Sequence, residues 1–300
     1  MAKRKNKKVT VNRNYKDTVF RKLFSDRRNL LSLYNAINGT AYTDETKLEI
    51  VTLENAIYMG IKNDLAFIID TNLFLYEHQS TYNPNMPLRD LFYISSEYQK
   101  LVDRKSLYSS ILLKLPAPNF IVFYNGKRKM PDRWTNCLSE SYENQQGDPN
   151  LELKVVTINI NSDCNRKLME QCRILGEYAQ YVEKVRKNAE TMSLDVAVKE
   201  AVDECIQKGI LADFLRVNRA EVIAMSIFEY DKEEEEQKLQ ATYEKIGEKR
   251  GIQIGEKQGE LKKAKSIAIS LAQEGESVER IARILGETEK TIKEWLAETH

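Results

Sequence analysis

The sequence predicts a mixed α/β core followed by a helical extension, and three observations support this. Short β-rich runs alternate with helical patterns as far as Ile160, the order expected of a sheet covered by helices. After Asn165 only helical periodicity remains, and charged residues become dense from Asp231 onward. The chain has 300 residues, 42% of them apolar, and exceeds the usual size of a single core. We therefore expect one large domain with an appendage.

The first half of the chain is divided by residues that helices and strands tolerate poorly. Asn38-Gly39 ends the first helical pattern, Asp70-Thr71 forms a turn between two β-rich runs, and Pro116 ends a long helix. The expected elements are a helix over 17–37, a strand over 48–54, paired strands over 64–69 and 72–79, a helix over 88–115, and strands over 119–125 and 153–160.

Composition divides the chain into four parts. Residues 1–13 form a basic arm without apolar periodicity, which is typical of a segment that stays disordered until it binds an anion. Residues 14–230 form the core domain. Residues 231–262 form a charged linker with glycine at 247, 251, 255 and 259, and residues 263–300 form a small helical module.

The usage of cysteine, histidine and charge argues against several classes of function. The four cysteines lack C-x-x-C spacing, which disfavours a zinc knuckle and a disulfide scaffold. Because the histidines are His78 and His300, a catalytic triad or multi-histidine zinc site would depend on His78. The formal charge is +1, so attraction to nucleic acid would come from local patches. Without a membrane-length apolar run or a signal peptide, we expect a soluble, cytoplasmic protein with no membrane partner.

The paired strands bring acidic residues together. A two-residue turn at Asp70-Thr71 makes the numbers of opposed residues sum to a constant, so that Asp64 faces Glu77. Alternation along the strand places Gln79 on the same face as Glu77 and turns His78 to the other face, where packing or hydrogen bonding is its expected role. Such hard oxygen ligands suit Mg²⁺ or Mn²⁺. The alternative is that Asp64 caps a turn and the other two lie on a solvated strand face.

The residues around this hairpin resemble a known family. The matching stretches are Lys62-Asn-Asp-Leu-Ala-Phe-Ile-Ile, Tyr76-Glu-His-Gln-Ser-Thr-Tyr-Asn-Pro-Asn-Met-Pro-Leu-Arg89 and Leu115-Pro-Ala-Pro-Asn-Phe-Ile-Val-Phe-Tyr-Asn-Gly126. They are similar to the Rpn family of recombination-promoting nucleases, also described as transposases, in the PD-(D/E)XK superfamily. The likeness extends through Ile158-Asn-Ile-Asn161 and Glu221-Val-Ile-Ala-Met225, and so covers most of the chain.

This resemblance implies a restriction-endonuclease-like core and a role for each hairpin residue. Asp64 and Glu77 match the acids that bind Mg²⁺, with Mn²⁺ as a substitute, and Gln79 stands where the superfamily usually has lysine. Glutamine carries no positive charge, but it can still position the attacking water. Asp17 matches an extra acid that many members place near the metal. An acid at a helix N-terminus favoured by the helix dipole explains Asp17 equally well.

Several further residues are candidates for contacts with DNA. Arg89 could meet a phosphate near the metal, while Tyr98 and Gln99 could line the same cleft, although such residues are more often surface or packing residues. The first helix also carries a basic cluster that could follow a DNA backbone or simply face water: Arg21, Lys22, Arg27 and Arg28.

The C-terminal extension has two features of its own. Glycine at every fourth position forms a smooth helix face that could contact a second copy of the chain in a homo-oligomer, or could belong to a flexible linker. Residues 277–285 and 287–296 read as two short helices joined at Gly286. In a DNA-binding module Lys290 and Lys293 would face the major groove. The alternative is a simple helical docking module. In both cases the same residues would pack between the helices: Ile281, Ala282, Leu285, Ile292 and Trp295.

Taken with the resemblance, the sequence predicts a Mg²⁺-dependent endonuclease that cleaves DNA in recombination or transposon-like breakage. The alternative is a non-catalytic DNA-binding or assembly protein that uses the same fold as a scaffold. The glutamine at position 79 is the feature that most favours the alternative.

Overall fold

The computed structural model describes residues 18–51 and 65–297. The expected basic arm over 1–13, Asp17 and Asp64 lie outside the described residues. The chain divides into two compact units, residues 1–234 and 235–300, and helix α7 (Ala212–Gln273) belongs to both. Among the described residues, no helix combines the length and the apolar character that crossing a membrane requires.

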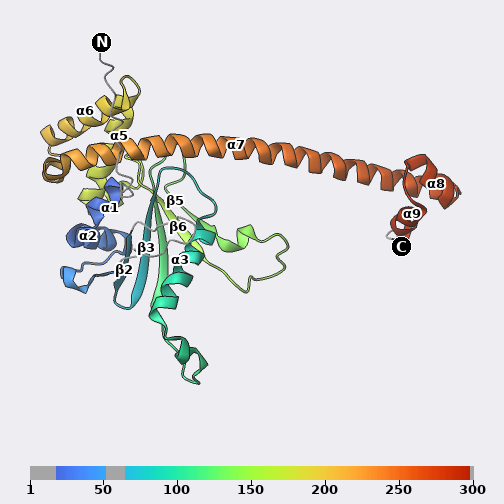
Figure 1. Ribbon diagram of the computed structural model, residues 1–300, viewed down its shortest axis with the longest axis horizontal. Helices are drawn as coiled ribbons and strands as arrows, with labels where there is room; N and C mark the ends of the chain where they lie inside the picture. Colours follow the sequence, from blue (N-terminus) through green and yellow to red (C-terminus); the bar gives the residue numbers. More distant parts are fainter. Residues whose placement is uncertain (1–17, 52–64, 298–300) are drawn as a thin grey trace, which may run out of the picture. The chain divides into compact units, whose positions relative to one another are not determined.

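The first unit is built on one mixed sheet, confirming the predicted α/β core (Figure 1). Its strands in the described part of the chain lie in the order β1-β2-β3-β4-β6-β5. Strands β3, β4 and β6 run parallel, whereas β1, β2 and β5 are antiparallel to their neighbours. The bounds are Glu49–Ile50 for β1, Leu65–Ile69 for β2, Asn72–Gln79 for β3, Ala117–Tyr124 for β4, Arg133–Cys137 for β5 and Lys154–Asn159 for β6.

The predicted hairpin register is confirmed over every described pair of β2 and β3. Leu65 lies opposite Tyr76, and Ile69 lies opposite Asn72, so opposed positions keep the expected constant sum. Asp70 and Thr71 form the turn with φ of 45° and 65°. Two consecutive positive φ values are typical of the tight turn whose twist matches that of antiparallel strands.

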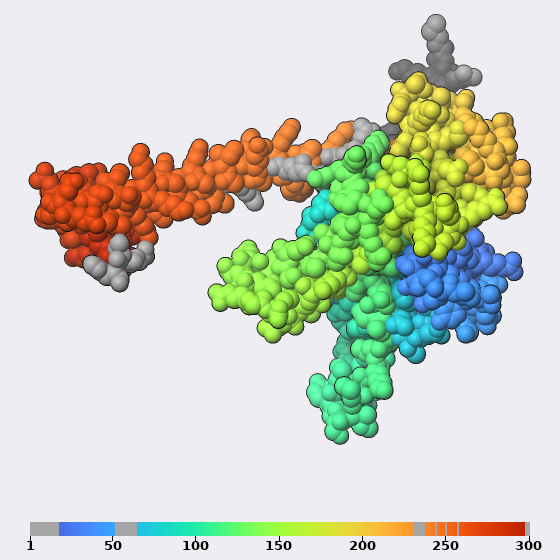
Figure 2. All heavy atoms as spheres, turned by 180° about the vertical axis from the view of Figure 1, so that it is seen from behind, coloured from blue at the N-terminus to red at the C-terminus, as the bar shows by residue number. Residues whose placement is uncertain are grey.

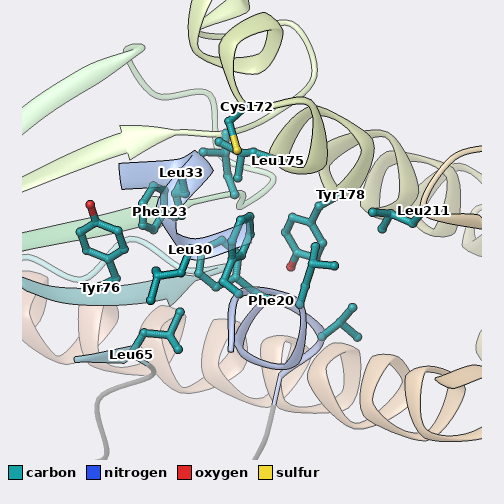
Figure 3. Packing of buried hydrophobic residues seen from close by; sticks show 14 of the residues in the cluster. Phe20, Leu30, Leu33, Leu65, Tyr76, Phe123, Cys172, Leu175, Tyr178 and Leu211 are labelled. Carbon is teal, nitrogen blue, oxygen red and sulfur yellow. The ribbon is translucent and has the colours of Figure 1, made fainter. Parts of the chain in front are cut away.

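Helices cover both faces of the sheet. The larger core lies between one face and the helices α1 (Val19–Phe24), α2 (Arg27–Asn38), α5 (Arg173–Ala189), α6 (Leu194–Gln207) and the first part of α7. There Phe20 contacts Phe123 and Tyr178, with ring centroids 5.2 and 5.6 Å apart (Figure 3). The other face packs on α3 (Met86–Leu101) through a smaller core. The short helix α4 (Arg166–Gln171) precedes α5.

Two of the expected helices have wrong boundaries, and one strand was missed. The helix predicted over 17–37 is two helices, because Asp26 accepts hydrogen bonds from the backbone amides of Arg28 and Asn29 and so starts a second one. The helix predicted over 88–115 ends at Leu101, where Asp103 caps a short 3₁₀ helix, Arg104–Tyr108. Strand β5 was not predicted, and it pairs with β6 at the edge of the sheet. Two other 3₁₀ turns occupy Glu45–Lys47 and Leu138–Ser141.

The second unit contains the end of α7 and the two short helices that the sequence predicts. Helix α8 (Val278–Leu285) is capped by the Ser277 hydroxyl and ends at Gly286 with φ of 70°, and α9 (Glu289–Ala297) follows. All five expected packing residues belong to its core: Ile281, Ala282, Ile292 and Trp295 are buried, and Leu285 packs against them. The hydrophobic periodicity of this segment therefore predicted its packing correctly.

Candidate functional site

The candidate site lies at the C-terminal end of β3, on the face of the sheet that packs on α3. Leu73 and Leu75 point into the smaller core on this face, and alternation places Glu77 and Gln79 on the same side. The Glu77 side chain is almost completely buried, with 2% of its surface exposed. Gln79 Nε2 donates a hydrogen bond to Glu77 Oε2 over 3.1 Å. The two residues that strand alternation placed on one face, Glu77 and Gln79, are therefore in direct contact.

Arg89, in the first turns of α3, joins this pair. Its Nη2 lies 3.4 Å from Glu77 Oε2, and its Nη1 lies 3.5 Å from the Met86 sulfur. The Arg89 side chain is about a quarter exposed, at 24%. A buried carboxylate needs such a partner, because removing an isolated charge from water is costly. Arg89 therefore neutralises part of the charge on the candidate ligand Glu77.

Asp90 is a site residue that the sequence reasoning missed. It lies on the buried face of α3 with 2% of its surface exposed. Burial raises the pKa of the Asp90 carboxyl well above its usual range, the charge of Glu77 raises this pKa further, and Arg89 opposes both effects. Its Oδ1 atom has no hydrogen-bond partner within the described part of the chain. An aspartate on the apolar face of a helical pattern was the signal available in the sequence.

Tyr93, one turn after Asp90, borders the same cluster. Its side chain is 4% exposed and belongs to the smaller core. Burial raises the pKa of the Tyr93 hydroxyl, and the nearby negative charge of Glu77 raises it further. Tyr93 therefore stays neutral at all physiological pH values. A neutral phenol beside two carboxylates adds a polar group without adding charge.

The donor set of the cluster fits a hard divalent cation. Glu77 and Asp90 offer carboxylate oxygens in a buried setting, and the Arg89 guanidinium, paired with Glu77, balances one of the two negative charges when both acids are ionised. A proton on Asp90 or a cation would balance the other. Within residues 18–51 and 65–297, no group of three or more acids, histidines or cysteines is placed to hold a metal. A full coordination shell would thus need water or residues beyond the described ones.

Tyr98 and Gln99 lie away from this cluster. Both line a cavity of about 720 Å³ between the later turns of α3, strand β4 and residues 151–154. Glu77, Gln79 and Arg89 do not line this cavity. The Tyr98 hydroxyl donates a hydrogen bond to the carbonyl of Pro116 over 2.7 Å. The expectation that these residues share one cleft with the acids is not met, because α3 carries them along the sheet toward the beginning of β4.

His78 points to the opposite face, as predicted. Its ring stacks on Phe20 with centroids 5.1 Å apart, and its Nε2 lies 3.1 Å from the Tyr178 hydroxyl. The side chain therefore has the packing and hydrogen-bonding role that the strand alternation predicted. Its ring lies on the face of the sheet opposite Glu77.

The basic residues proposed for DNA contacts are partly engaged within the protein. Lys22 pairs with Glu221 on α7, and Arg28 Nε lies 3.4 Å from a Glu45 carboxylate oxygen. Lys290 and Lys293 are exposed on α9, and each ammonium lies 3.9 Å from a glutamate of the same helix, Glu294 and Glu289 respectively. Surface pairs of this kind contribute little stability but lower the local positive charge.

The chain matches no model of a known protein family, no curated protein and no solved structure.

Proposed function

We propose that the protein is a metal-dependent endonuclease that hydrolyses DNA phosphodiester bonds at the Glu77 cluster. The observation that carries this proposal is the pair of buried carboxylates, Glu77 on β3 and Asp90 on α3, of which Glu77 is paired with Arg89 and raises the pKa of Asp90. A fold built only for stability gains little from two such acids in an apolar interface. Catalytic and metal sites, in contrast, concentrate buried charges with shifted pKa values.

In this proposal the acids hold Mg²⁺, or Mn²⁺ in its place. Glu77 and Asp90 would supply oxygen ligands from the described part, and Asp64, which the sequence predicts to face Glu77, would supply another. Asp64 itself lies outside the described residues. When bound, the metal would activate a water molecule and stabilise the negative charge that develops on the phosphate.

The remaining residues position groups around the acids. Gln79 donates its amide hydrogen to Glu77, which orients that carboxylate and leaves the Gln79 carbonyl oxygen as an acceptor for a water molecule. Arg89 pairs with the Glu77 carboxylate and offsets part of its negative charge. The biological setting that follows from the family resemblance is recombination or transposon-like DNA breakage in the cytoplasm.

The experiment is a plasmid-nicking assay with and without Mg²⁺. We expect Glu77→Gln, which removes one charge while keeping the shape, to reduce nicking by about 100-fold or more, since single metal ligands and charge-stabilising groups typically have effects of this size. Glu97→Gln is the matched control. Glu97 is another buried glutamate of the same domain, with 3% exposure, but its carboxylate pairs with Lys100 over 2.6 Å. Its variant should nick normally.

Two results would contradict the proposal. Wild-type protein that never nicks DNA with either Mg²⁺ or Mn²⁺ would leave the non-catalytic alternative, in which the fold serves binding or assembly. That alternative is favoured by one observation, namely that Gln79 uses its amide on Glu77 and brings no positive charge to the site. Nicking that persists in Glu77→Gln at the wild-type rate would assign the activity to another site or to a contaminant.

A further inference from the structure

An apolar segment stands out from the first unit directly after α3. We call residues 104–115 the apolar arm; it is the green projection at the bottom of Figure 2. Its large side chains are unusually exposed: Leu107 at 64%, Tyr108 at 92%, Ile111 at 75% and Leu112 at 85%. Contiguous exposed apolar surface of this kind marks an interaction site in soluble proteins, because water is released when a partner covers it.

A groove that could receive such a segment lies beside the base of the arm. It is the cavity of about 720 Å³ that Tyr98 and Gln99 line. Its walls are mainly apolar and include Ile94, Val102, Phe120 and Leu153. We call it the α3 groove. Leu107 and Leu115, near the two ends of the arm, form part of its wall, whereas Tyr108, Ile111 and Leu112 do not line it. The arm therefore borders its own groove without filling it.

The charges around these two surfaces are opposite in sign. The apolar arm carries Arg104, Lys105 and Lys114, all exposed, and has no acidic residue. Residues 139–150, which we call the acidic loop, lead into the groove-lining residues 151–154 and have no lysine or arginine. The acidic loop carries three exposed acids, which are Glu140, Glu143 and Asp148.

We propose that the apolar arm of one chain occupies the α3 groove of a second copy, and that the contact is reciprocal. One chain thus offers a projecting apolar segment, an apolar groove and surfaces of opposite charge, which is what a two-fold interface made of the same surface on both subunits requires. Steering by opposite charges favours the correct encounter of such surfaces. An anionic membrane would attract the arm but repel the acidic loop that leads into the groove, so a second copy fits the surface better.

The first test compares two exposed apolar positions in the full chain. Sedimentation should show a wild-type dimer of twice the 34.8 kDa chain mass, and Leu112→Asp should raise its dissociation constant by about tenfold or more, as loss of a central apolar contact does. Val217→Asp is the matched control, because Val217 on α7 is 84% exposed but lies outside both surfaces. Its variant should dimerise normally. A monomeric wild type, or unchanged dimerisation of Leu112→Asp, overturns the proposal.

The second test uses charge reversal and does not depend on apolar substitutions. One variant reverses the arm with Arg104→Glu and Lys105→Glu, and the other reverses the loop with Glu140→Lys and Glu143→Lys. Each alone should dimerise at least about tenfold more weakly at low salt, whereas an equal mixture should form heterodimers with wild-type affinity, since both contacts in the mixed pair are again complementary. Absence of heterodimers in the mixture contradicts the reciprocal contact.

A vesicle experiment separates the proposal from membrane binding. Wild-type protein and Leu112→Asp are each mixed with phosphatidylserine vesicles and sedimented. The proposal expects little binding of either one. Binding by a monomeric wild type that is lost in Leu112→Asp would assign the arm to a membrane surface and overturn the dimer.

Discussion

Asp90 illustrates how a single buried residue can matter more than its sequence pattern suggests. Its carboxyl lies among apolar side chains of the smaller core and close enough to Glu77 for that charge to raise its pKa. Keeping this group ionised costs free energy. Protonation avoids that cost, and a cation or the neighbouring Arg89 can offset it. The residue therefore couples the stability of the first unit to pH and, under the proposed function, to metal.

We predict that Asp90→Asn stabilises the protein at neutral pH when no metal is present. Because the folded-state pKa of Asp90 lies above the ordinary 3.8, its protonated form favours folding; this contribution is full below pH 3.8 and is lost as pH rises through the raised pKa. Asparagine stays neutral at every pH, so Asp90→Asn does not lose this stabilisation as the pH rises. We expect a gain of about 1 kcal/mol, or about 2–4 °C in Tm, in calorimetry at pH 7.

Metal addition and an exposed aspartate provide the controls for this prediction. Mg²⁺ should raise the Tm of the wild type more than that of Asp90→Asn, since a ligand that binds only the folded state stabilises it. Asp148→Asn, at an exposed position, should leave Tm and its pH dependence unchanged. A lower Tm for Asp90→Asn at pH 7 without metal would show that the ionised Asp90 is stabilising and would refute this account.

At the scale of elements, the β2–β3 hairpin is the part that positions the site. Its two-residue turn decides the register, and the register decides which side chains of β3 face α3. A slip by one residue would send Glu77 and Gln79 to the other face, where His78 now packs on Phe20. The turn therefore determines which side chains reach the site, although it lies at the opposite end of β3 from Glu77.

We predict that Thr71→Gly stabilises this hairpin. Thr71 is an exposed β-branched residue at φ 65°, a conformation that glycine adopts without steric cost. The relief of strain exceeds the added entropy of the unfolded chain, so we expect the free energy of unfolding to rise by about 1 kcal/mol in a denaturant titration. Thr135→Gly in β5, at an exposed strand position without positive φ, should instead destabilise the protein. Equal decreases in the free energy of unfolding of the two variants would contradict the prediction.

At the scale of the whole molecule, the second unit is a helical module whose exposed charges nearly cancel. On α9, Lys290 and Lys293 each lie 3.9 Å from a glutamate of the same helix. Affinity for DNA depends on net positive charge that displaces counterions from phosphates. The arrangement favours docking on a protein surface over tight binding of a DNA backbone.

We predict that the double variant Lys290→Ala with Lys293→Ala changes DNA affinity by less than about twofold, because the glutamate beside each lysine already weakens its attraction to a phosphate. Glu289→Gln with Glu294→Gln should raise the affinity and steepen its dependence on salt. Fluorescence anisotropy of a labelled duplex at two salt concentrations measures both effects. A large loss on removing the lysines would show that α9 contacts DNA directly.

Features that depend on neighbours along the chain could be predicted from the sequence. The turn at Asp70-Thr71, the hairpin register, the placement of His78 away from Glu77, and the packing residues of the C-terminal module all follow from turn preferences and side-chain periodicity. The α/β character of the core followed from the same patterns. These local rules apply before any tertiary contact is known.

Only the tertiary structure decided how distant segments meet. It placed Asp90 beside Glu77, carried Tyr98 and Gln99 into a separate groove, and left the residues after Leu101 exposed instead of helical. It also added β5 to the sheet edge. The physical reason is that periodicity shows which side chains share a face of an element, whereas packing between elements selects the partner of that face. The β2–β3 hairpin could therefore be predicted, and the partner that α3 brings to it could not.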